Sequence, residues 1–498
     1  MKRSPAESES INIMTYYLAV DIGASSGRHI LAHMENGKLL LEEIYRFENR
    51  FETSDGHKVW NTEKLFAEIL EGLRKCRECG KIPVSMGIDT WAVDYVLLDS
   101  GDRMIGPCYA YRDGRTEGME EEVYRLVPED LLYRKTGIQR ASFNTVFQLM
   151  ADLKQMPERL EQAETFLMVP DYLQFLLTGI KKQEYTNAST TGLLAAAQYD
   201  WDRELIRQLH YPERLFKPLS LPGTEAGMLR PEIAAELGFD LKVILPATHD
   251  TASAVMSVPF RKGENALYLS SGTWSLLGCE MAVPDTGKQA QHANFTNEGG
   301  YDHRFRFLKN IMGLWMIQSV QRELQEGYAA DASGRFRTDP ADTDYSFGHL
   351  CRRAADEKTG TTVDADDARF LAPASMIREI RLAAEESGQE IPETPWELAR
   401  VVYHSLAVCY KKAVQQLSEI TGRHFDTIHI VGGGCKAAYL NRLTAEETGL
   451  TVTAGPSEAT AAGNIGAQIL ADHAAGTLED FRKLVYDSFS VETYRKEQ

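Results

Sequence analysis

The hydrophobic pattern of the first fifty residues predicts three consecutive strands. The run "YYLAVDI" is interrupted by small residues from Gly23 to Gly27, and apolar positions then resume. The polar stretch "ENGK" is typical of a hairpin turn before the third run, "LLLEEIYRF". Small residues at the first interruption leave backbone N–H groups open to a close ligand. Two further strands are expected between residues 82 and 99, separated by a loop centred on Asp89 to Val93.

Helical spacing of apolar positions appears next in the chain. It predicts helices from residue 62, over 144–161, and over a long segment that begins at the N-cap Thr394 and ends at Gly422. The segment 326–369 is rich in Asp, Gly and Thr and favours loops with little order of their own.

The opening pattern recurs about 250 residues later. "ENALYLSSGTWSLLGCEM" again predicts strand, small-residue turn and strand, and "TIHIVGGGC" and "LTVTAGPSEATAAGNIGAQIL" each predict a strand followed by a helix. This repetition indicates a duplicated α/β domain. We expect a disordered tail over 1–15, an N-terminal domain over 16–256 that holds sugar and phosphate, and a C-terminal domain over 257–485 that holds the nucleotide.

Composition narrows the class of protein. The chain has 498 residues and a net charge of −18, which argues against nucleic acid as a partner. It has seven cysteines, an odd number, and no apolar stretch long enough for a signal peptide or a membrane span. We therefore expect a soluble cytoplasmic protein, a monomer or weak homodimer. Cys76 and Cys79 have the spacing of metal ligands, but without a second pair they favour helix-surface cysteines over a zinc site.

The first small-residue turn has candidate chemistry for phosphate. It lacks the lysine of a P-loop and the G-x-G-x-x-G of a dinucleotide site. Its backbone N–H groups and the hydroxyls of Ser25 and Ser26 suit a phosphate, with Arg28 at the far lip. Asp21 is placed to hold a hydrated Mg²⁺. An ordinary tight turn with a capping aspartate is the alternative.

A second set of small residues would face the first across a cleft. Ser270 to Trp274 supplies further donors, and the glycines from Gly432 to Gly434 would let a base or ribose lie on the backbone. Together these turns indicate a nucleotide clamp.

Within "LPATHDTASAV", Asp250 is placed to accept a proton from an alcohol that attacks a γ-phosphate. A carboxylate stabilised by a helix N-terminus is the structural alternative.

Ten motifs in chain order resemble the FGGY carbohydrate kinases of the actin–hexokinase superfamily. They are "DIGASSGR", "GIDTWAVDYVLLD", "AYRDGRT", "EYTNASTT", "HDTASAV", "YLSSGTWS", "TNEGG", "LKNIMGLW", "HIVGGGC" and "AGPSEATAAGNIG". The resemblance extends from about residue 16 to about residue 485. It implies an α/β fold of two ribonuclease-H-like (actin-like ATPase) domains with ATP and sugar in the interdomain cleft.

The resemblance also implies roles for individual residues. Asp250 would be the proton acceptor, and Asp21 would hold Mg²⁺ through water. The residues expected to bind ATP are Ala24, Ser25, Ser26, Gly27, Arg28, Thr273, Gln318 and Gly433. Those expected to bind the sugar are Ala92, His249, Asp250, Thr251 and Asn310. Position 92 departs from the form of the motif in which glycine follows the tryptophan, and the extra methyl group bears on substrate preference.

The more particular motifs, "GIDTWAVDY", "HDTASAV" and "LKNIMGLW", imply one activity within the family. It is transfer of the γ-phosphate of ATP to the C1 hydroxyl of L-rhamnulose. A kinase for another ketose, such as L-fuculose or L-xylulose, would use the same phosphate apparatus. An actin-like ATP-binding switch acting on protein partners is the alternative from another class.

Overall fold

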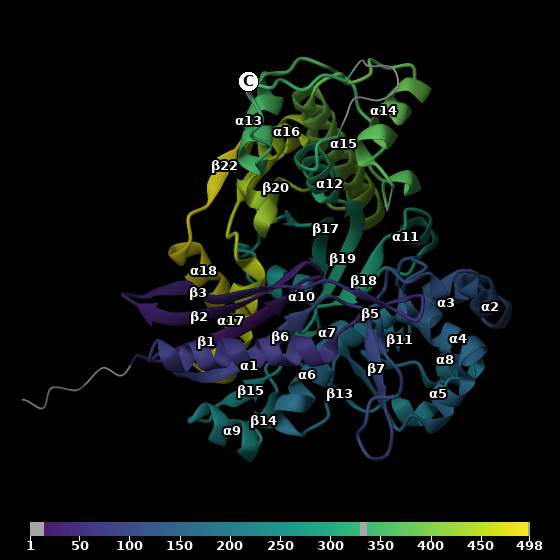
Figure 1. The fold of residues 1–498 in the computed structure, drawn as a ribbon, viewed down its shortest axis with the longest axis vertical. Helices are drawn as coiled ribbons and strands as arrows, with labels where there is room; N and C mark the ends of the chain where they lie inside the picture. The colour runs from purple at the N-terminus through teal and green to yellow at the C-terminus, as the bar shows by residue number, and fades with distance from the viewer. Residues whose placement is uncertain (1–13, 329–335, 372, 497–498) are drawn as a thin grey trace, which may run out of the picture.

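The computed structural model describes residues 14–328, 336–371 and 373–496. Most of the tail expected over 1–15 lies outside the described residues. Two mixed sheets dominate the molecule, one in the lower and one in the upper half of Figure 1. The α/β fold class predicted from the sequence is confirmed.

The first sheet has the strand order β14-β15-β6-β1-β2-β3. The first three strands of the chain follow the predicted pattern, because β1 pairs antiparallel with β2, and β2 pairs antiparallel with β3. β6 and β15 continue the sheet on the other side of β1 in parallel. The bounds are β1 Tyr16–Ile22, β2 Ser26–Glu35, β3 Lys38–Glu48, β6 Pro83–Thr90, β14 Glu225–Met228 and β15 Lys242–Ile244.

The second sheet repeats this arrangement, with the order β18-β19-β17-β16-β20-β21-β22. β16 takes the place of β1, pairing antiparallel with β17 and parallel with β20. The expected duplication therefore holds at the level of topology. The bounds are β16 Ala266–Ser271, β17 Trp274–Met281, β18 Thr296–Gly299, β19 Phe305–Met312, β20 Thr427–Val431, β21 Thr451–Ala454 and β22 Glu492–Tyr494.

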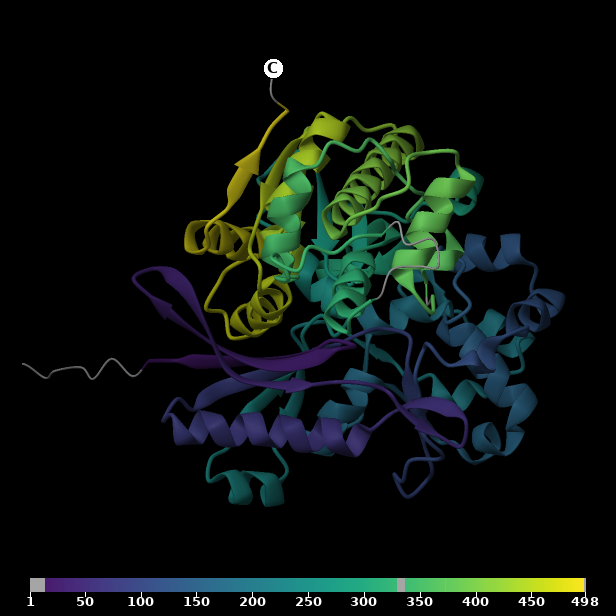
Figure 2. The same ribbon diagram turned by 45° about the horizontal axis from the view of Figure 1, so that its top comes forward.

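Helices cover the first sheet on both faces. Helices α1 (Thr62–Glu78), α6 (Val169–Thr178) and α9 (Pro231–Leu237) pack together on one side. On the other side lie α17 (Ala459–Ala471) and α18 (Leu478–Ser488), which come from the end of the chain. Both views show these yellow helices beside the purple strands (Figures 1 and 2). The C-terminal segment thus completes the first sheet's core.

The second sheet packs against α15, the long predicted helix. Thr394 caps it as expected by accepting a hydrogen bond from Glu397 N, and Gly422 ends it in the left-handed conformation. The bounds of α15 are Pro395–Thr421, and the other helices of this half are α11 Lys288–His292, α12 Trp315–Gln325, α13 Phe347–Asp356, α14 Met376–Glu386 and α16 Ala438–Thr448.

A mainly helical insertion follows the first sheet's early strands and lies at the right of Figure 1. Its helices are α2 Met119–Leu126, α3 Glu129–Thr136, α4 Thr145–Gln155, α5 Pro157–Gln162, α7 Tyr185–Ala188 and α8 Arg203–Gln208. The short strands here and nearby are β4 Glu52–Ser54, β5 His57–Trp60, β7 Tyr95–Leu98, β8 Cys108–Tyr109, β9 Thr165–Met168, β10 Gln183–Glu184, β11 Leu194–Ala195, β12 Asp200–Trp201 and β13 Leu219–Ser220.

Three local predictions need correction. The helix expected over 144–161 is two helices, because Pro157 cannot continue the first one. The segment 326–369 contains α13, whose Leu350 and Cys351 are buried in the second core. Asp89 lies inside β6, not in a loop, since β6 extends to Thr90 in register with β1. In the described part of the chain, no helix combines the length and apolarity needed to cross a bilayer.

The two sheets meet through α10 (Asp250–Met256) and α17, which pack directly on one another. A Cβ atom added at Gly463 would lie 1.7 Å from the carbonyl oxygen of Ser253. Only glycine allows this approach, because the neighbour is backbone and has no rotamer to change. The interface between the halves therefore requires a residue without a side chain at position 463.

We predict that Gly463→Ala lowers the free energy of unfolding by about 2 kcal/mol, because overpacking outweighs the helix propensity gained. Urea unfolding of both proteins measures it. Gly348→Ala is the matched control, since its added Cβ meets only the end of the Arg352 side chain at 3.5 Å in α13. If G463A and G348A were equally stable, the close packing of α10 and α17 would not limit stability.

Candidate active site

An open cleft lies between the two sheets. Both halves of the chain line it, from the β1–β2 turn to the glycines that follow β20. The residues are Asp21, Gly23, Ala24, Ser25, Ser26, Arg28, Trp91, Ala92, Val93, Tyr111, Ile138, Gln139, Phe143, Asn144, Thr190, His249, Asp250, Thr251, Ser270, Ser271, Gly272, Thr273, Trp274, Leu276, Glu298, Asn310, Gly432, Gly433, Ser457 and Thr460.

The turn between β1 and β2 forms one wall of the cleft. Gly23 N donates to Ser26 O at 2.9 Å, which closes the turn. Asn49 supports the turn from behind with two hydrogen bonds. Its side-chain amide donates to Gly23 O at 2.8 Å, and its backbone N–H donates to Ser25 O at 3.1 Å. Backbone carbonyls are thus bound inside the protein, while small side chains line the cleft.

The turn between β16 and β17 forms the opposite wall. Gly272 N donates to Trp274 O, and Leu314 N donates to Gly272 O. Gly432 has a φ of +83°, and a Cβ atom added at Gly434 would lie 1.9 Å from Ser271 Oγ. The first of these glycines permits a left-handed backbone and the last permits close packing of the two turns. The glycine run therefore serves the turn as well as the surface of the cleft.

Three carboxylates meet at the cleft floor, and strand pairing brings them there. The parallel register of β1 and β6 places Asp21 beside Asp89. A bridge between Thr90 and His249 brings Asp250 to the same edge. Asp89 is fully buried, and burial followed by the charge of Asp21 raises its pKa well above the usual value. Like charges in such a site disfavour ionisation of all three groups together.

Basic and amide groups partly balance these carboxylates. Arg28 Nη2 lies 2.9 Å from Asp21 Oδ2, and its Nη1 lies 2.7 Å from Glu458 Oε2. Asn464 of α17 donates to Asp89 Oδ2 at 2.6 Å. Asp89 Oδ1 has no hydrogen-bond partner among the described residues. The site therefore retains oxygen atoms able to bind a cation or a proton.

Asp250 begins α10 and faces the cleft. Thr251 donates to Asp250 Oδ1 from its backbone N–H at 2.5 Å and from its hydroxyl at 3.1 Å. Burial, and then the charge of Asp21, raises the pKa of Asp250 to about 7. A carboxylate with this pKa can accept a proton near neutral pH and release it again.

His249 lies beside Asp250, with its Nε2 3.5 Å from Asp250 Oδ1. Its Nδ1 points the other way, toward Arg306 and Glu298, at 3.0 and 3.4 Å. Burial and the Arg306 charge lower the pKa of His249 well below its usual value. The ring is therefore neutral near pH 7.

Most of the residues predicted from the sequence line this cleft. Twelve do so: Asp21, Ala24, Ser25, Ser26, Arg28, Ala92, His249, Asp250, Thr251, Thr273, Asn310 and Gly433. Gly27 and Gln318 do not. Gly27 lies inside β2 against the ring of Phe47, and Gln318 lies half-buried on α12. The ligand roles of all fourteen stay predictions.

Other lining residues were missed by sequence reasoning. Trp91, Val93, Tyr111 and Phe143 add an apolar wall, and Glu298 adds a buried carboxylate. Glu298 stands within the motif "TNEGG", so the sequence marked this segment but gave Glu298 no role. Arg306 and Asn464 act on the site from behind, and only the tertiary contacts reveal them.

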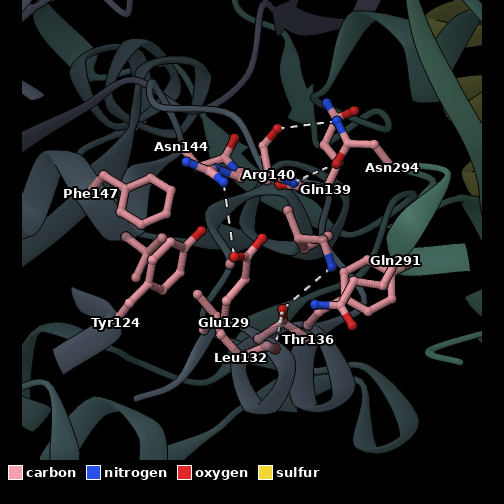
Figure 3. A pocket seen from close by; sticks show the side chains of 14 residues that line it. Tyr124, Glu129, Leu132, Thr136, Gln139, Arg140, Asn144, Phe147, Gln291 and Asn294 are labelled. Carbon is pink, nitrogen blue, oxygen red and sulfur yellow. Dashed lines mark hydrogen bonds and ion pairs between the residues drawn. The ribbon is translucent and has the colours of Figure 1, made fainter. Parts of the chain in front are cut away.

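A smaller pocket adjoins the cleft. It shares Ile138, Gln139 and Asn144 with the cleft lining, and Figure 3 shows Tyr124 and Glu129 on its opposite side. Asn294 accepts a hydrogen bond from Arg140 N across it at 2.9 Å, which links the insertion to the second half of the chain. The pocket is therefore part of the contact between the two halves.

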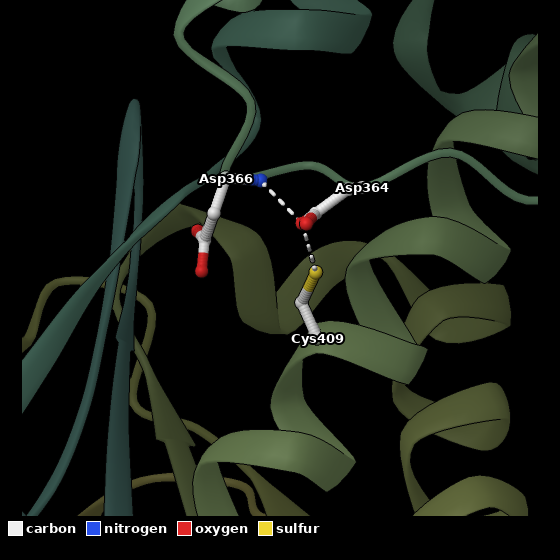
Figure 4. Close-up of side chains that lie close together, drawn as sticks. All are labelled: Asp364, Asp366 and Cys409. Atoms are coloured by element: carbon white, nitrogen blue, oxygen red, sulfur yellow. Dashed lines mark hydrogen bonds between the residues drawn. The ribbon is translucent and has the colours of Figure 1, made fainter. Parts of the chain in front are cut away.

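One group of metal-ligand-type side chains was found in the described ranges, and it is outside the cleft lining. It consists of Asp364, Asp366 and Cys409 (Figure 4). Cys409 Sγ contacts Asp364 Oδ1 at 3.9 Å. The pair Cys76 and Cys79 is not in this group, and both are free thiols. The expectation of helix-surface cysteines is wrong for Cys76, which α1 buries in the first core, whereas Cys79 is exposed at the end of that helix.

The repeated sheets and the cleft between them define a two-domain α/β sugar-kinase fold. A gluconate kinase from Lactobacillus acidophilus superposes with a TM-score of 0.77 at 16% identity, covering 97% of this chain and 94% of that one. Plasmodium falciparum glycerol kinase with ADP gives a TM-score of 0.72 at 15% identity, with 97% and 95% covered.

The family follows from sequence models of both halves. Residues 16–257 match the N-terminal domain of the FGGY family of carbohydrate kinases, and residues 267–471 match its C-terminal domain. The chain belongs to this family, as the resemblance implied. It is therefore a carbohydrate kinase, and ATP is the phosphoryl donor that the family implies.

Curated relatives are similar over almost the whole chain. A rhamnulokinase of Halalkalibacterium halodurans is 48% identical over 97% of this chain and 99% of its own length. A rhamnulokinase of Oceanobacillus iheyensis is 47% identical, with 96% and 98% covered.

The raised pKa of Asp250 predicts how stability changes with pH. The folded pKa of about 7 exceeds the unfolded value, so the folded state binds the proton more tightly. The contribution of Asp250 to the free energy of unfolding is therefore fully present below the unfolded pKa, near 4, and is lost as the pH rises through about 7. Asp250→Asn removes this loss and should be more stable than the native protein by about 2 kcal/mol at pH 8.

Thermal or urea unfolding at pH 4.5 and pH 8 measures the difference. The advantage of D250N should shrink toward zero at the lower pH. Asp356→Asn, at an exposed position on α13, is the control and should change stability little at either pH. A D250N protein no more stable than the native one at pH 8 would contradict the raised pKa.

Proposed function

We propose that this enzyme is an L-rhamnulose kinase. It transfers the γ-phosphoryl group of ATP to the C1 hydroxyl of L-rhamnulose and produces L-rhamnulose 1-phosphate and ADP. The observation that carries the proposal is the position of Asp250, at the cleft floor between the small-residue turns of the two sheets. The choice of sugar is supported by rhamnulokinases that are 40–48% identical over nearly the full length.

Asp250 acts as the general base in the proposed reaction. Its carboxylate accepts the proton of the C1 hydroxyl while that oxygen forms a bond to the γ-phosphorus. The bond from phosphorus to the β,γ-bridging oxygen breaks, and ADP leaves with the electron pair. The proton passes from Asp250 to solvent after product release, which restores the base.

The two small-residue turns bind the nucleotide in this proposal. Backbone N–H groups of the turn at Ala24 to Arg28 and of the turn at Ser271 to Thr273 stabilise the charge that develops on the phosphates. The Gly432–Gly433 surface offers a flat, side-chain-free place for the nucleoside. Closure of the halves excludes water, which would otherwise compete with the sugar.

Two carboxylates of the floor, Asp21 and Asp89, fit a bound Mg²⁺. Carboxylate oxygens are the ligands that this ion prefers, and Asp89 Oδ1 lacks a hydrogen-bond partner among the described residues. Asp21 would hold the ion through water, with Asp89 behind it. When bound, Mg²⁺ neutralises charge on the β- and γ-phosphates. Arg28, which binds Asp21 here, would then be available to the phosphates.

The cytoplasm is the compartment we propose. All seven cysteines of the chain are free thiols, and all five buried ones lie in hydrophobic cores. A reducing environment maintains such thiols without a disulfide framework.

A panel of ketoses tests the proposed substrate. L-rhamnulose, L-fuculose and L-xylulose are each supplied with ATP and Mg²⁺, and ADP release is measured by a coupled assay. We expect the highest kcat/KM with L-rhamnulose. Preference for another ketose would replace the substrate but keep the reaction, whereas slow ATP hydrolysis indifferent to all sugars would support an actin-like switch.

Replacement of the proposed base tests the mechanism. Asp250→Asn keeps the size and the Thr251 contacts but cannot accept the proton, so kcat should fall by ~10²–10⁴. ATP affinity, measured by calorimetry, should be nearly unchanged. D356N is again the control and should retain native turnover. Near-native turnover of D250N would remove Asp250 from this role.

A further inference from the structure

Arg306 is an arginine buried completely behind the sugar side of the cleft. It lies on β19 and does not line the cleft itself. Its Nε donates to Gly299 O at 2.9 Å, and its Nη2 lies 3.0 Å from both Glu298 Oε2 and His249 Nδ1. A fixed guanidinium therefore contacts the Nδ1 edge of the His249 ring from inside the protein.

This contact determines where the imidazole carries its proton. A guanidinium has only N–H donors and stays charged at any pH the protein tolerates. His249 Nδ1 must therefore accept from Arg306, and a ring nitrogen that accepts holds no proton. The single proton of the neutral ring is then on Nε2, the atom 3.5 Å from Asp250 Oδ1 and directed to the cleft.

The surroundings of His249 would otherwise favour a different state. The charged groups that contact its ring are Asp250 at Nε2, and Glu298 and Arg306 at Nδ1. Two carboxylates without the arginine would stabilise an imidazolium or place the proton on Nδ1, toward Glu298. Burial, and then the Arg306 charge, lowers the pKa of His249 instead, in agreement with the geometry.

We propose that Arg306 is a positioning residue that holds His249 as a neutral donor with its proton on Nε2. In this state His249 donates a hydrogen bond to a sugar oxygen next to the reacting hydroxyl. It cannot remove the hydroxyl proton, which leaves Asp250 as the one base at that place. The donor's target rests on the proposed function, whereas the protonation state does not.

The native protein tests the protonation state directly. Long-range ¹H–¹⁵N spectra of histidine-labelled protein distinguish protonated from unprotonated ring nitrogens, and the spectrum of His249→Asn identifies the signals of residue 249. We expect a protonated Nε2 and an unprotonated Nδ1 at pH 7.5, unchanged at pH 6. A protonated Nδ1 at pH 7.5, with or without a protonated Nε2, would overturn the proposal.

Two substitutions test whether Arg306 is responsible. Arg306→Met removes the donor and should transfer the His249 proton to Nδ1 or produce the imidazolium at pH 6. Arg306→Lys retains a cationic donor and should keep the native spectrum at least in part. A folded R306M protein with the native His249 spectrum would overturn the role of Arg306. If R306M does not fold, the spectra of the native protein and of R306K still test the protonation state of His249.

A matched pair at position 249 tests the donor in catalysis. The amide of Gln reaches the place of Nε2, whereas the amide of Asn reaches only that of Nδ1. His249→Gln should therefore retain at least about tenfold more kcat/KM toward the ketose than His249→Asn, the value of one hydrogen bond. ATP affinity should be the same in both. Equal kcat/KM in the two variants would contradict a donor at Nε2.

The outcomes separate this inference from the proposed function. A protein with the expected His249 spectrum that phosphorylates no ketose would retain the role of Arg306 and lose the proposed substrate. A ketose kinase with a protonated Nδ1 would retain the function and lose the inference.

Discussion

The packing of α10 on α17 is the contact on which the site depends. The helices touch through Gly463 and Ser253 without a side chain between them. This contact brings the two sheets together beside the floor of the cleft. It also carries chemistry, because Asp250 begins one of these helices and Asn464, beside the glycine, binds Asp89. The packing contact and the proposed catalytic base thus lie within the same few residues.

The electrostatics of the cleft floor follow from this packing. Parallel pairing of β1 and β6 places Asp21 and Asp89 side by side, and the start of α10 adds Asp250. Three carboxylates in a buried place cannot all ionise without compensation. The raised pKa values of Asp89 and Asp250 are the result, and they suit a site whose ligands bring a cation and a proton. Ionising these buried carboxylates therefore lowers the free energy of unfolding, although the proposed reaction requires Asp250 to be ionised.

The sugar side shows how a second layer of residues sets the properties of the first. His249 contacts the cleft, but Arg306 and Glu298 determine which of its nitrogens can donate. Arg306 is fully buried on β19, and its partners are Glu298 and Gly299 of β18 and His249, the residue before α10. Such a contact has no signature in local sequence, because its members are up to 57 residues apart.

Local patterns predicted the strands, the long helix and the duplicated topology well, since each depends on short-range periodicity and turn chemistry. The same patterns located both small-residue turns and Asp250, because small residues and an isolated acid stand out from apolar neighbours. They did not locate the end of β6, where Asp89 is held in the strand by its pairing with β1. They also missed α13, which is helical because its apolar face packs into the second core.

The sequence by itself determined the family and the fold class, and most of the site residues that it predicts line the cleft. Which residues contact one another across that cleft was decided only by the tertiary structure. The family resemblance implies ATP contacts for Gln318 and Gly27, yet neither lines the cleft, whereas Glu298 does and Arg306 lies directly behind it. The physical reason is that periodicity specifies which face of an element is buried, but the neighbour on that face comes from a distant part of the chain.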